Sequence, residues 1–265
     1  MKIRAIALNT FASLVRNKAI IIFCAVFLCV LLLMMTPMMA VKSMAATQSV
    51  EQGQAMVLGV VSLVMGMVTG FGSLLAAWSA ADAIGSEMKS GTILAVMARP
   101  VRRWEFLLGK FLGVQLLMAL YVVLMFGLSY LLAWMGGQRI QSMPWALVVY
   151  PMVRYAIYSA LAMLLVTRMH PVIAFVIVLL ASVLAGMVTP GGSSILPGWL
   201  RAGLHIVLPS TNLLSESNFL TITQASIKQI PWTNHLIALA HGLDYALVCF
   251  LLAAWSFRDR SLSRD

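Results

Sequence analysis

Long apolar runs separated by short polar connections dominate this chain of 265 residues. A helix that crosses the hydrocarbon core of a membrane needs about 20 mainly apolar residues. The pattern therefore predicts six membrane-spanning helices. The expected spans cover residues 19–41, 55–81, 105–135, 145–167, 171–189 and 233–257.

One connection is much longer than the others. Residues 190–232 contain an apolar piece at 195–208, but prolines and glycines break the segment too often for a confident further span. The interrupting residues are Pro190, Gly191, Gly192, Pro197, Pro209 and Pro231. We expect this segment to be an outer connection with short interfacial helices.

The first 18 residues place polar and apolar side chains on opposite faces of a helix. The polar face contains Lys2, Asn9, Ser13, Arg16 and Asn17. The apolar face contains Ile3, Ala7, Leu8, Phe11, Leu14 and Val15, with Arg4 as the exception. Such a helix is expected to lie in the membrane interface before the first span. The alternative is a solvated start to that span.

The composition agrees with a membrane protein. The chain is 62% hydrophobic and 10% charged, whereas soluble domains carry about 25% charged residues. We therefore predict an all-α integral membrane protein with a single transmembrane domain. The first apolar run exceeds the roughly 7–15 residues of a signal-peptide core, so we expect it to be a retained span. The three cysteines, Cys24, Cys29 and Cys249, lie in apolar runs, and their spacing indicates neither a disulfide framework nor a zinc site.

The distribution of basic residues predicts the orientation. With the N-terminus in the cytoplasm, thirteen of the 18 lysines and arginines are cytoplasmic, four are outside and Arg154 is in a span. This bias follows the positive-inside rule and places both termini in the cytoplasm. The net charge of +10 therefore indicates membrane topology and not a nucleic-acid partner. The cytoplasmic group is Lys2, Arg4, Arg16, Lys18, Lys89, Arg99, Arg102, Arg103, Lys110, Arg168, Arg258, Arg260 and Arg264, and the outer group is Lys42, Arg139, Arg201 and Lys228.

The connection between the second and third spans, residues 82–104, is unusually polar and lies on the cytoplasmic side in this topology. The helix of the second span is expected to continue into it, with Asp82 and Glu87 on its polar faces. Arg99 precedes Pro100 and is therefore expected to end that helix. One interpretation is a loop whose arginines contact anionic headgroups, at about 1 kcal/mol for each arginine.

Residues 87–110 follow the pattern E-x-x-x-G-T-x-x-x-x-x-x-R-P-V-x-R-x-x-x-x-x-G-K. The residues that spell it are Glu87, Gly91, Thr92, Arg99, Pro100, Val101, Arg103, Gly109 and Lys110. This pattern resembles the signature of ABC-2 type transporter permeases, in which it also joins the second and third spans. The rest of the predicted layout is similar to that family, and Leu-Pro-Ser-Thr-Asn at 208–212 resembles a proline-containing element of its last connection.

The resemblance implies a permease subunit of an ATP-driven exporter in a bacterial inner membrane. It implies a homodimer or a pair with a second permease, together with two copies of a separate ABC ATPase that binds ATP and magnesium. The polar connection would be a coupling helix that docks in a groove of the ATPase. Glu87 would receive a basic residue of that partner, and Gly91 would allow close approach. The expected coupling residues are Asp82, Glu87, Gly91, Thr92, Arg99, Pro100, Arg102, Arg103, Gly109 and Lys110.

We expect the chain itself to bind no cofactor and to catalyse no reaction. A phosphate-binding loop of the form GxxxxGK[ST] is missing from the sequence. Phe111 follows Gly109 and Lys110 where the motif needs a hydroxyl, and Trp104 stands at the position of the first glycine.

Two charged residues, Arg154 and Asp244, fall inside the fourth and sixth expected spans. Each costs about 2.5–3.5 kcal/mol on membrane-insertion scales. Both lie roughly 13–17 Å from the outer ends of their helices, at about 1.5 Å per residue. One hypothesis is a buried pair between them, and the other is that each faces a watery cavity between two protomers. His241, one turn before Asp244, indicates either a proton or ligand site or a polar packing role.

The methionine-rich end of the first span allows two interpretations. Met34, Met35, Met38 and Met39 surround Pro37, and thioethers are ligands for copper(I). Methionine also fills irregular apolar interfaces, and we expect no metal here.

Two other functions stay open at this level. One is an accessory permease that does mechanical work on an envelope complex. The other is a membrane-embedded enzyme or envelope assembly factor that uses Arg154, His241 and Asp244. An enzyme needs ionisable groups that converge at one depth, and His170, His205 and His241 fall in different segments.

Overall fold

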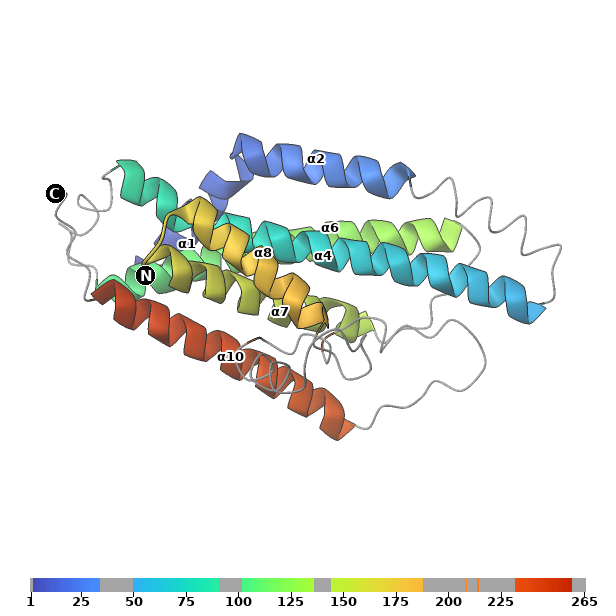
Figure 1. Cartoon of the computed structure of the whole chain (residues 1–265). Coiled ribbons are helices and arrows are strands. Elements are labelled where there is room, and N and C mark those ends of the chain that lie inside the picture. The colour runs from blue at the N-terminus through green and yellow to red at the C-terminus, as the bar shows by residue number, and fades with distance from the viewer. Residues whose placement is uncertain are drawn as a thin grey trace.

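The structure, a computed structural model, describes residues 2–33, 50–90, 102–135, 144–187 and 232–258, together with Leu208 and Leu214. Over these ranges the elements are α-helices and no strand is present. Figure 1 shows them as an elongated bundle. The helices are α1 (Lys2–Val15), α2 (Lys18–Leu33), α4 (Val50–Ser90), α6 (Arg103–Met135), α7 (Pro144–Val166), α8 (Pro171–Met187) and α10 (Trp232–Arg258).

Four helices are long and apolar enough to cross a membrane, namely α4, α6, α7 and α10. The bent pair of α1 and α2 would add a fifth span, and α8 is a shorter apolar helix. Each of the six predicted windows overlaps one described helix, and the predicted all-α membrane fold is confirmed. Helix α4 extends to Ser90, so the helix of the second window continues into the polar connection.

Local sequence signals set several helix boundaries. Asn17 separates α1 from α2, and its Oδ1 accepts a hydrogen bond from the backbone N–H of Ala19 at 2.9 Å. This is the capping interaction expected of an asparagine before a helix, and the two helices meet there at 60°. Pro144 and Pro171 are the first residues of α7 and α8, where the missing N–H of proline has no helical partner to lose.

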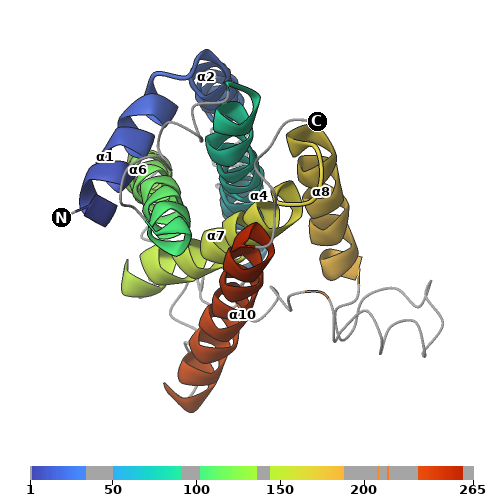
Figure 2. The same ribbon diagram turned by 90° about the vertical axis from the view of Figure 1, so that its left-hand side faces the viewer.

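Helix α7 is at the centre of the bundle and contacts α10, α4, α6 and α8 (Figure 2). Gly72 of α4 makes a close approach to two other helices, because a Cβ there would collide with Tyr155 of α7 and lie 2.7 Å from Tyr121 of α6. The Tyr121 hydroxyl donates to the Val68 carbonyl at 2.8 Å. Three helices therefore meet closely at one glycine.

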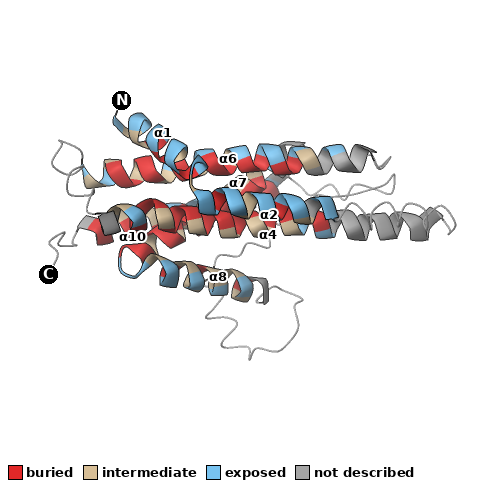
Figure 3. Ribbon diagram, turned by 90° about the horizontal axis from the view of Figure 1, so that it is seen from above, coloured by how far each residue is buried: buried red, intermediate tan, exposed pale blue. Residues whose placement is uncertain are grey.

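The outer faces of the bundle are apolar. Exposed residues run along α2 and α8 (Figure 3), and large apolar side chains such as Ile22, Val123 and Leu236 are more than half exposed. Helix α10 shows the pattern most clearly, since its buried side lies against α7 and leucines occupy much of the rest. Such surfaces suit a hydrocarbon environment and explain the composition.

The end of α4, the beginnings of α6 and α8, the end of α10 and the helix α1 gather at one end of the bundle (Figure 1). We call this the signature end. Arg102, Arg103 and Arg168 belong to the elements that meet there, as does Lys2 of α1. These basic residues therefore lie at the same end of the bundle.

The packed face of α1 coincides with part of the predicted apolar face. Ala7, Thr10 and Leu14 are buried, whereas Leu8 and Val15 of the expected apolar face are exposed. The reason is that α1 packs along α6, where Gly109 makes room for Ile6 and Gly113 for Thr10. The spacing of polar and apolar residues shows that the helix is amphipathic, but it does not show which neighbouring helix covers part of the apolar face.

Candidate coupling site

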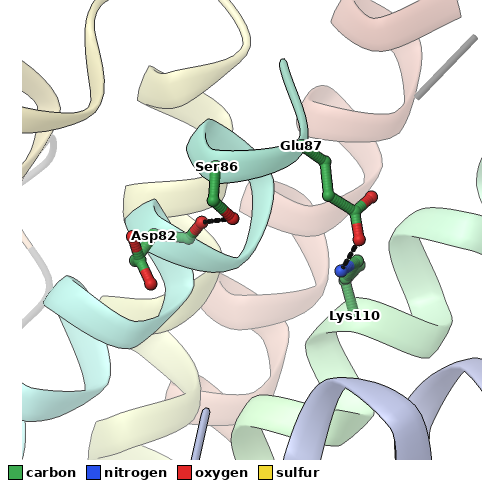
Figure 4. A network of polar contacts seen from close by, with 4 residues as sticks. All are labelled: Asp82, Ser86, Glu87 and Lys110. Atoms are coloured by element: carbon green, nitrogen blue, oxygen red, sulfur yellow. Dashed lines mark hydrogen bonds and ion pairs between the residues drawn. The ribbon is translucent and has the colours of Figure 1, made fainter. Parts of the chain in front are cut away.

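The two ends of the signature meet in space. Glu87 near the end of α4 and Lys110 in the first part of α6 form an ion pair (Figure 4). Lys110 is buried, and its ammonium also lies 5.6 Å from the ring centroid of Phe106. The pair, which we call the clasp, joins α4 to α6 across the connection between them. Glu87, expected to receive a basic residue of an ATPase, thus has a basic partner in its own chain.

Asp82 makes a second tie at this end. Its carboxylate accepts a hydrogen bond from Asn17 Nδ2 at 2.7 Å, so the residue that caps α2 also holds α4. The Ser86 hydroxyl donates to the Asp82 carbonyl at 2.7 Å within α4 (Figure 4). Asp82 therefore positions the α1–α2 bend against the end of α4.

Gly109 lies where α1 crosses α6. A Cβ at Gly109 would be 2.7 Å from Ile6, and one at Gly113 would be 2.6 Å from Thr10. Glycines four residues apart let two helix backbones approach closely. Gly109 of the signature therefore packs against α1, and the four-residue spacing to Gly113 is a signal that the sequence already contained.

The two arginines at the start of α6 have different surroundings. The Arg102 backbone N–H donates to Glu105 Oε2 at 3.0 Å, a capping contact, and its side chain is exposed. Arg103 Nη1 donates to the Phe257 carbonyl at 3.1 Å and so ties α6 to the end of α10. Arg102 is thus open to a partner or to lipid phosphate, while Arg103 holds the bundle together.

Four expected coupling residues lie outside the described residues: Gly91, Thr92, Arg99 and Pro100. Their place along the chain is between Ser90, the last residue of α4, and Arg102. The methionine cluster at 34–39 and His205 also lie outside the described residues.

The two intramembrane charges do not pair within the described chain. Arg154 of α7 is half-buried with its guanidinium carbon 6.0 Å from the Tyr158 ring centroid. His241 and Asp244 of α10 are exposed, and within the described ranges no ion pair joins Arg154 to Asp244. The structure thus lacks the ion pair between Arg154 and Asp244 within one chain. No group of three or more histidine, cysteine or acidic side chains that could hold a metal is found in the described part of the chain.

The sequence reasoning overlooked several polar contacts. Tyr150 of α7 and His235 of α10 are both buried, and the Tyr150 hydroxyl lies 2.6 Å from His235 Nδ1. At the signature end, Arg168 Nε donates to the Ser256 hydroxyl at 2.7 Å. The clue to His235 was the polar start of α10, but its tyrosine partner lies in an apolar run.

The comparisons with known proteins agree with this layout. The family model of the ABC-2 family transporter proteins matches residues 4–262. A search of the curated proteins gives no match. The match covers nearly the whole chain and includes every described helix from its first turns onward. The chain therefore belongs to the ABC-2 transporter family and is an integral, multi-pass membrane component of a transport system.

Proposed function

We propose that this chain is the permease subunit of an ATP-driven exporter and that a separate ABC ATPase supplies the energy. The observation that carries the proposal is the clasp. It joins two long helices at the point where the signature connects them, and the family match supports an ATPase partner. The chain would bind no nucleotide, and ATP and magnesium would bind to the ATPase.

The two helices joined by the clasp, α4 and α6, extend far from the signature end. Helix α4 has 41 residues and α6 has 33 residues, which correspond to roughly 60 and 50 Å at 1.5 Å per residue. A force applied to the connection between Ser90 and Arg102 therefore acts on two rods that are fixed together by Glu87 and Lys110. Closure of an ATPase pair would turn these two helices, and the permease would then change between an inward-facing and an outward-facing shape.

The same proposal includes the topology. Six spans, with α1 in the interface and α2 and α8 counted as spans, place both termini and the signature end in the cytoplasm. Two copies of the chain, or this chain and a second permease, would assemble in a bacterial inner membrane with two ATPases. The basic residues gathered at the signature end support this orientation.

Within the proposal, the coupling residues divide into a docking surface and a group that positions it. Gly91, Thr92, Arg99 and Pro100 would form the surface that docks on the ATPase. The exposed Arg102 would contact acidic residues or phosphates at its rim. Asp82, Glu87, Arg103, Gly109 and Lys110 would keep that surface in position, because each contacts another helix of this chain.

Co-purification from detergent-solubilised membranes of the native host tests the proposal. The wild-type chain, tagged in the outer connection, is expected to retain an ATPase. Gly91→Trp combined with Arg102→Glu is expected to lose it, because both changes alter the docking surface. Val123→Trp, at an exposed position of α6, is the matched control and is expected to retain the ATPase.

A charge exchange separates positioning from direct contact. Glu87→Lys alone is expected to weaken ATPase capture, and adding Lys110→Glu is expected to restore it. Restoration would show that Glu87 acts through Lys110. The proposal fails if no ATPase is captured by the wild type even after chemical crosslinking.

A further inference from the structure

Arg154 and Asp244 are two opposite charges in the middle parts of their helices, the first half-buried and the second exposed. Within the described residues neither has a hydrogen bond or an ion pair, and Arg154 Nε is buried without a partner. The only described neighbour assigned to the Arg154 charge is the face of the Tyr158 ring. Arginine cannot lose its proton in a protein, so this cation needs an anionic partner.

Asp244 cannot supply that partner within the same chain. Gly242 marks the side of α10 that faces α7, since a Cβ there would lie 2.5 Å from Val153. Ala246 and Cys249 are buried on the same side. Each residue of a helix turns by about 100°, so Asp244 points about 200° away from Gly242. Its carboxylate faces outward from the protomer, in agreement with its exposure.

The two charges nevertheless lie at the same depth. Arg154 is twelve residues from Val166, the last residue of α7, and Asp244 is fourteen residues from Arg258, the last of α10. Both helices end at the signature end (Figure 1). The separations are therefore about 18 and 21 Å along the two axes, at 1.5 Å per residue.

We propose that Asp244 of each protomer pairs with Arg154 of a second copy of this chain. A two-fold interface is self-complementary, so one contact between these residues generates the reciprocal contact. Two ion pairs at mid-depth would then neutralise all four charges of the dimer. The inference rests on the homodimer included in the proposed function and names the surface that forms it.

The surroundings of Asp244 favour a second copy over lipid. Leu247 and Leu251 follow it on the outward side and are each 57% exposed, and Ile237 precedes it at 62%. A lipid environment would suit these side chains but would leave the carboxylate in hydrocarbon, which is costly. A second copy supplies an apolar helix face together with a guanidinium at the matching depth.

Crosslinking between differently tagged copies tests the contact. One copy carries Arg154→Cys and the other Asp244→Cys, both in a background in which Cys24, Cys29 and Cys249 are replaced by serine. A short membrane-permeant thiol crosslinker is expected to join the two tags. The control pairs Arg154→Cys with Leu236→Cys, at an exposed position about 12 Å further along α10 at 1.5 Å per residue, and is expected to give no heterodimer.

A charge exchange tests the pairing itself. Arg154→Asp and Asp244→Arg, each alone, are expected to reduce the dimer fraction in detergent by about tenfold or more, since each juxtaposes like charges at a desolvated contact. The double variant is expected to return to within about twofold of the wild type. Circular dichroism of each variant checks that the helices are intact.

The outcomes separate this inference from the proposed function. A dimer that crosslinks at these positions but captures no ATPase supports the contact and contradicts the ATPase partner. An ATPase-bound chain without the crosslink, and without rescue by the double variant, overturns the contact. If Arg154→Gln leaves the dimer intact and abolishes only substrate-stimulated ATP hydrolysis, Arg154 binds a ligand and the proposed pair is wrong.

Discussion

Of two pairs of oppositely charged residues in this protein, one forms an ion pair within the chain and the other does not. Glu87 and Lys110 come from different helices and meet within one chain. Arg154 and Asp244 also come from neighbouring helices, at a common depth, but point in different directions. The first pair lies at the edge of the bundle, where the chain turns and can bring two helices together. The second pair lies in mid-helix, where the backbone fixes the directions of both side chains.

The difference teaches how to interpret charge in a membrane helix. A charge near a helix end is often matched by the chain's own fold, and its role is then structural. A charge at mid-depth that the fold leaves unmatched indicates a contact outside the protomer. The contrast predicts that loss of protomer stability is largest at the clasp, smaller at the contacts of α1, and smallest at Asp244.

Removing one partner of the clasp is expected to have the largest effect. Lys110→Met leaves the Glu87 carboxylate without its cation, and we expect a loss of about 3 kcal/mol in the free energy of unfolding. Thermal unfolding in detergent measures it. The double variant Lys110→Met/Glu87→Gln is the control and is expected to recover more than half of the loss. No recovery would show that Lys110 stabilises the protein by packing alone.

The glycine contact between α1 and α6 should come next. Gly113→Leu places a side chain where Thr10 and the backbone of α1 already lie. We expect about 1–3 kcal/mol of destabilisation, as for other overpacked contacts. Protease accessibility of α1 in membranes provides the measurement, and the same change at Gly127, where a Cβ would meet nothing within 4 Å, is the matched control. Equal effects at the two positions would contradict close packing of α1.

Asn17 caps the start of α2 and also donates a hydrogen bond to Asp82. Asn17→Ala is expected to cost about 1–2 kcal/mol, because it removes a helix cap and a hydrogen bond to Asp82. Chemical denaturation in detergent measures the loss. Asn17→Ser keeps a capping oxygen but does not reach Asp82, so an intermediate value is expected. A value equal to that of the alanine variant would assign the whole effect to the Asp82 contact.

The smallest effect on the protomer is expected at Asp244. Because this exposed carboxylate makes no hydrogen bond or ion pair within the described chain, Asp244→Asn should change the unfolding free energy by less than about 0.5 kcal/mol. Unfolding at a concentration where the wild type is monomeric makes this comparison. A loss comparable to that of Lys110→Met would mean that Asp244 is matched within its own chain.

The sequence alone was enough to predict the helices and their class. Apolar runs of sufficient length fix where helices form, and the predicted windows agree with the described helices to within a few residues in most cases. The exceptions are informative. Helix α4 runs to Ser90, beyond the predicted window that ends at residue 81, and the packed face of α1 includes Thr10, which an apolar-face pattern leaves out.

The site was only partly accessible from the sequence. The signature marked where the important residues lie, but not which of them contact one another. Glu87 and Lys110 are 23 residues apart, and only the antiparallel return of α6 beside α4 brings them together. The contact between Tyr150 and His235 spans 85 residues and carries no sequence pattern. Pairings of this kind depend on helix rotation, which composition and periodicity leave open.

The position of α1 limits how the signature end can move. The helix lies on the glycines of α6, while Asn17 at its end is fixed to Asp82 of α4. A movement that separated α4 from α6 would have to break the contact of α1 with the α6 glycines, the hydrogen bond from Asn17 to Asp82, and the clasp. The easier response to a push between Ser90 and Arg102 is for the three helices to tilt as one body. At this end, the protomer has the mechanics of a lever and not those of a pair of tongs.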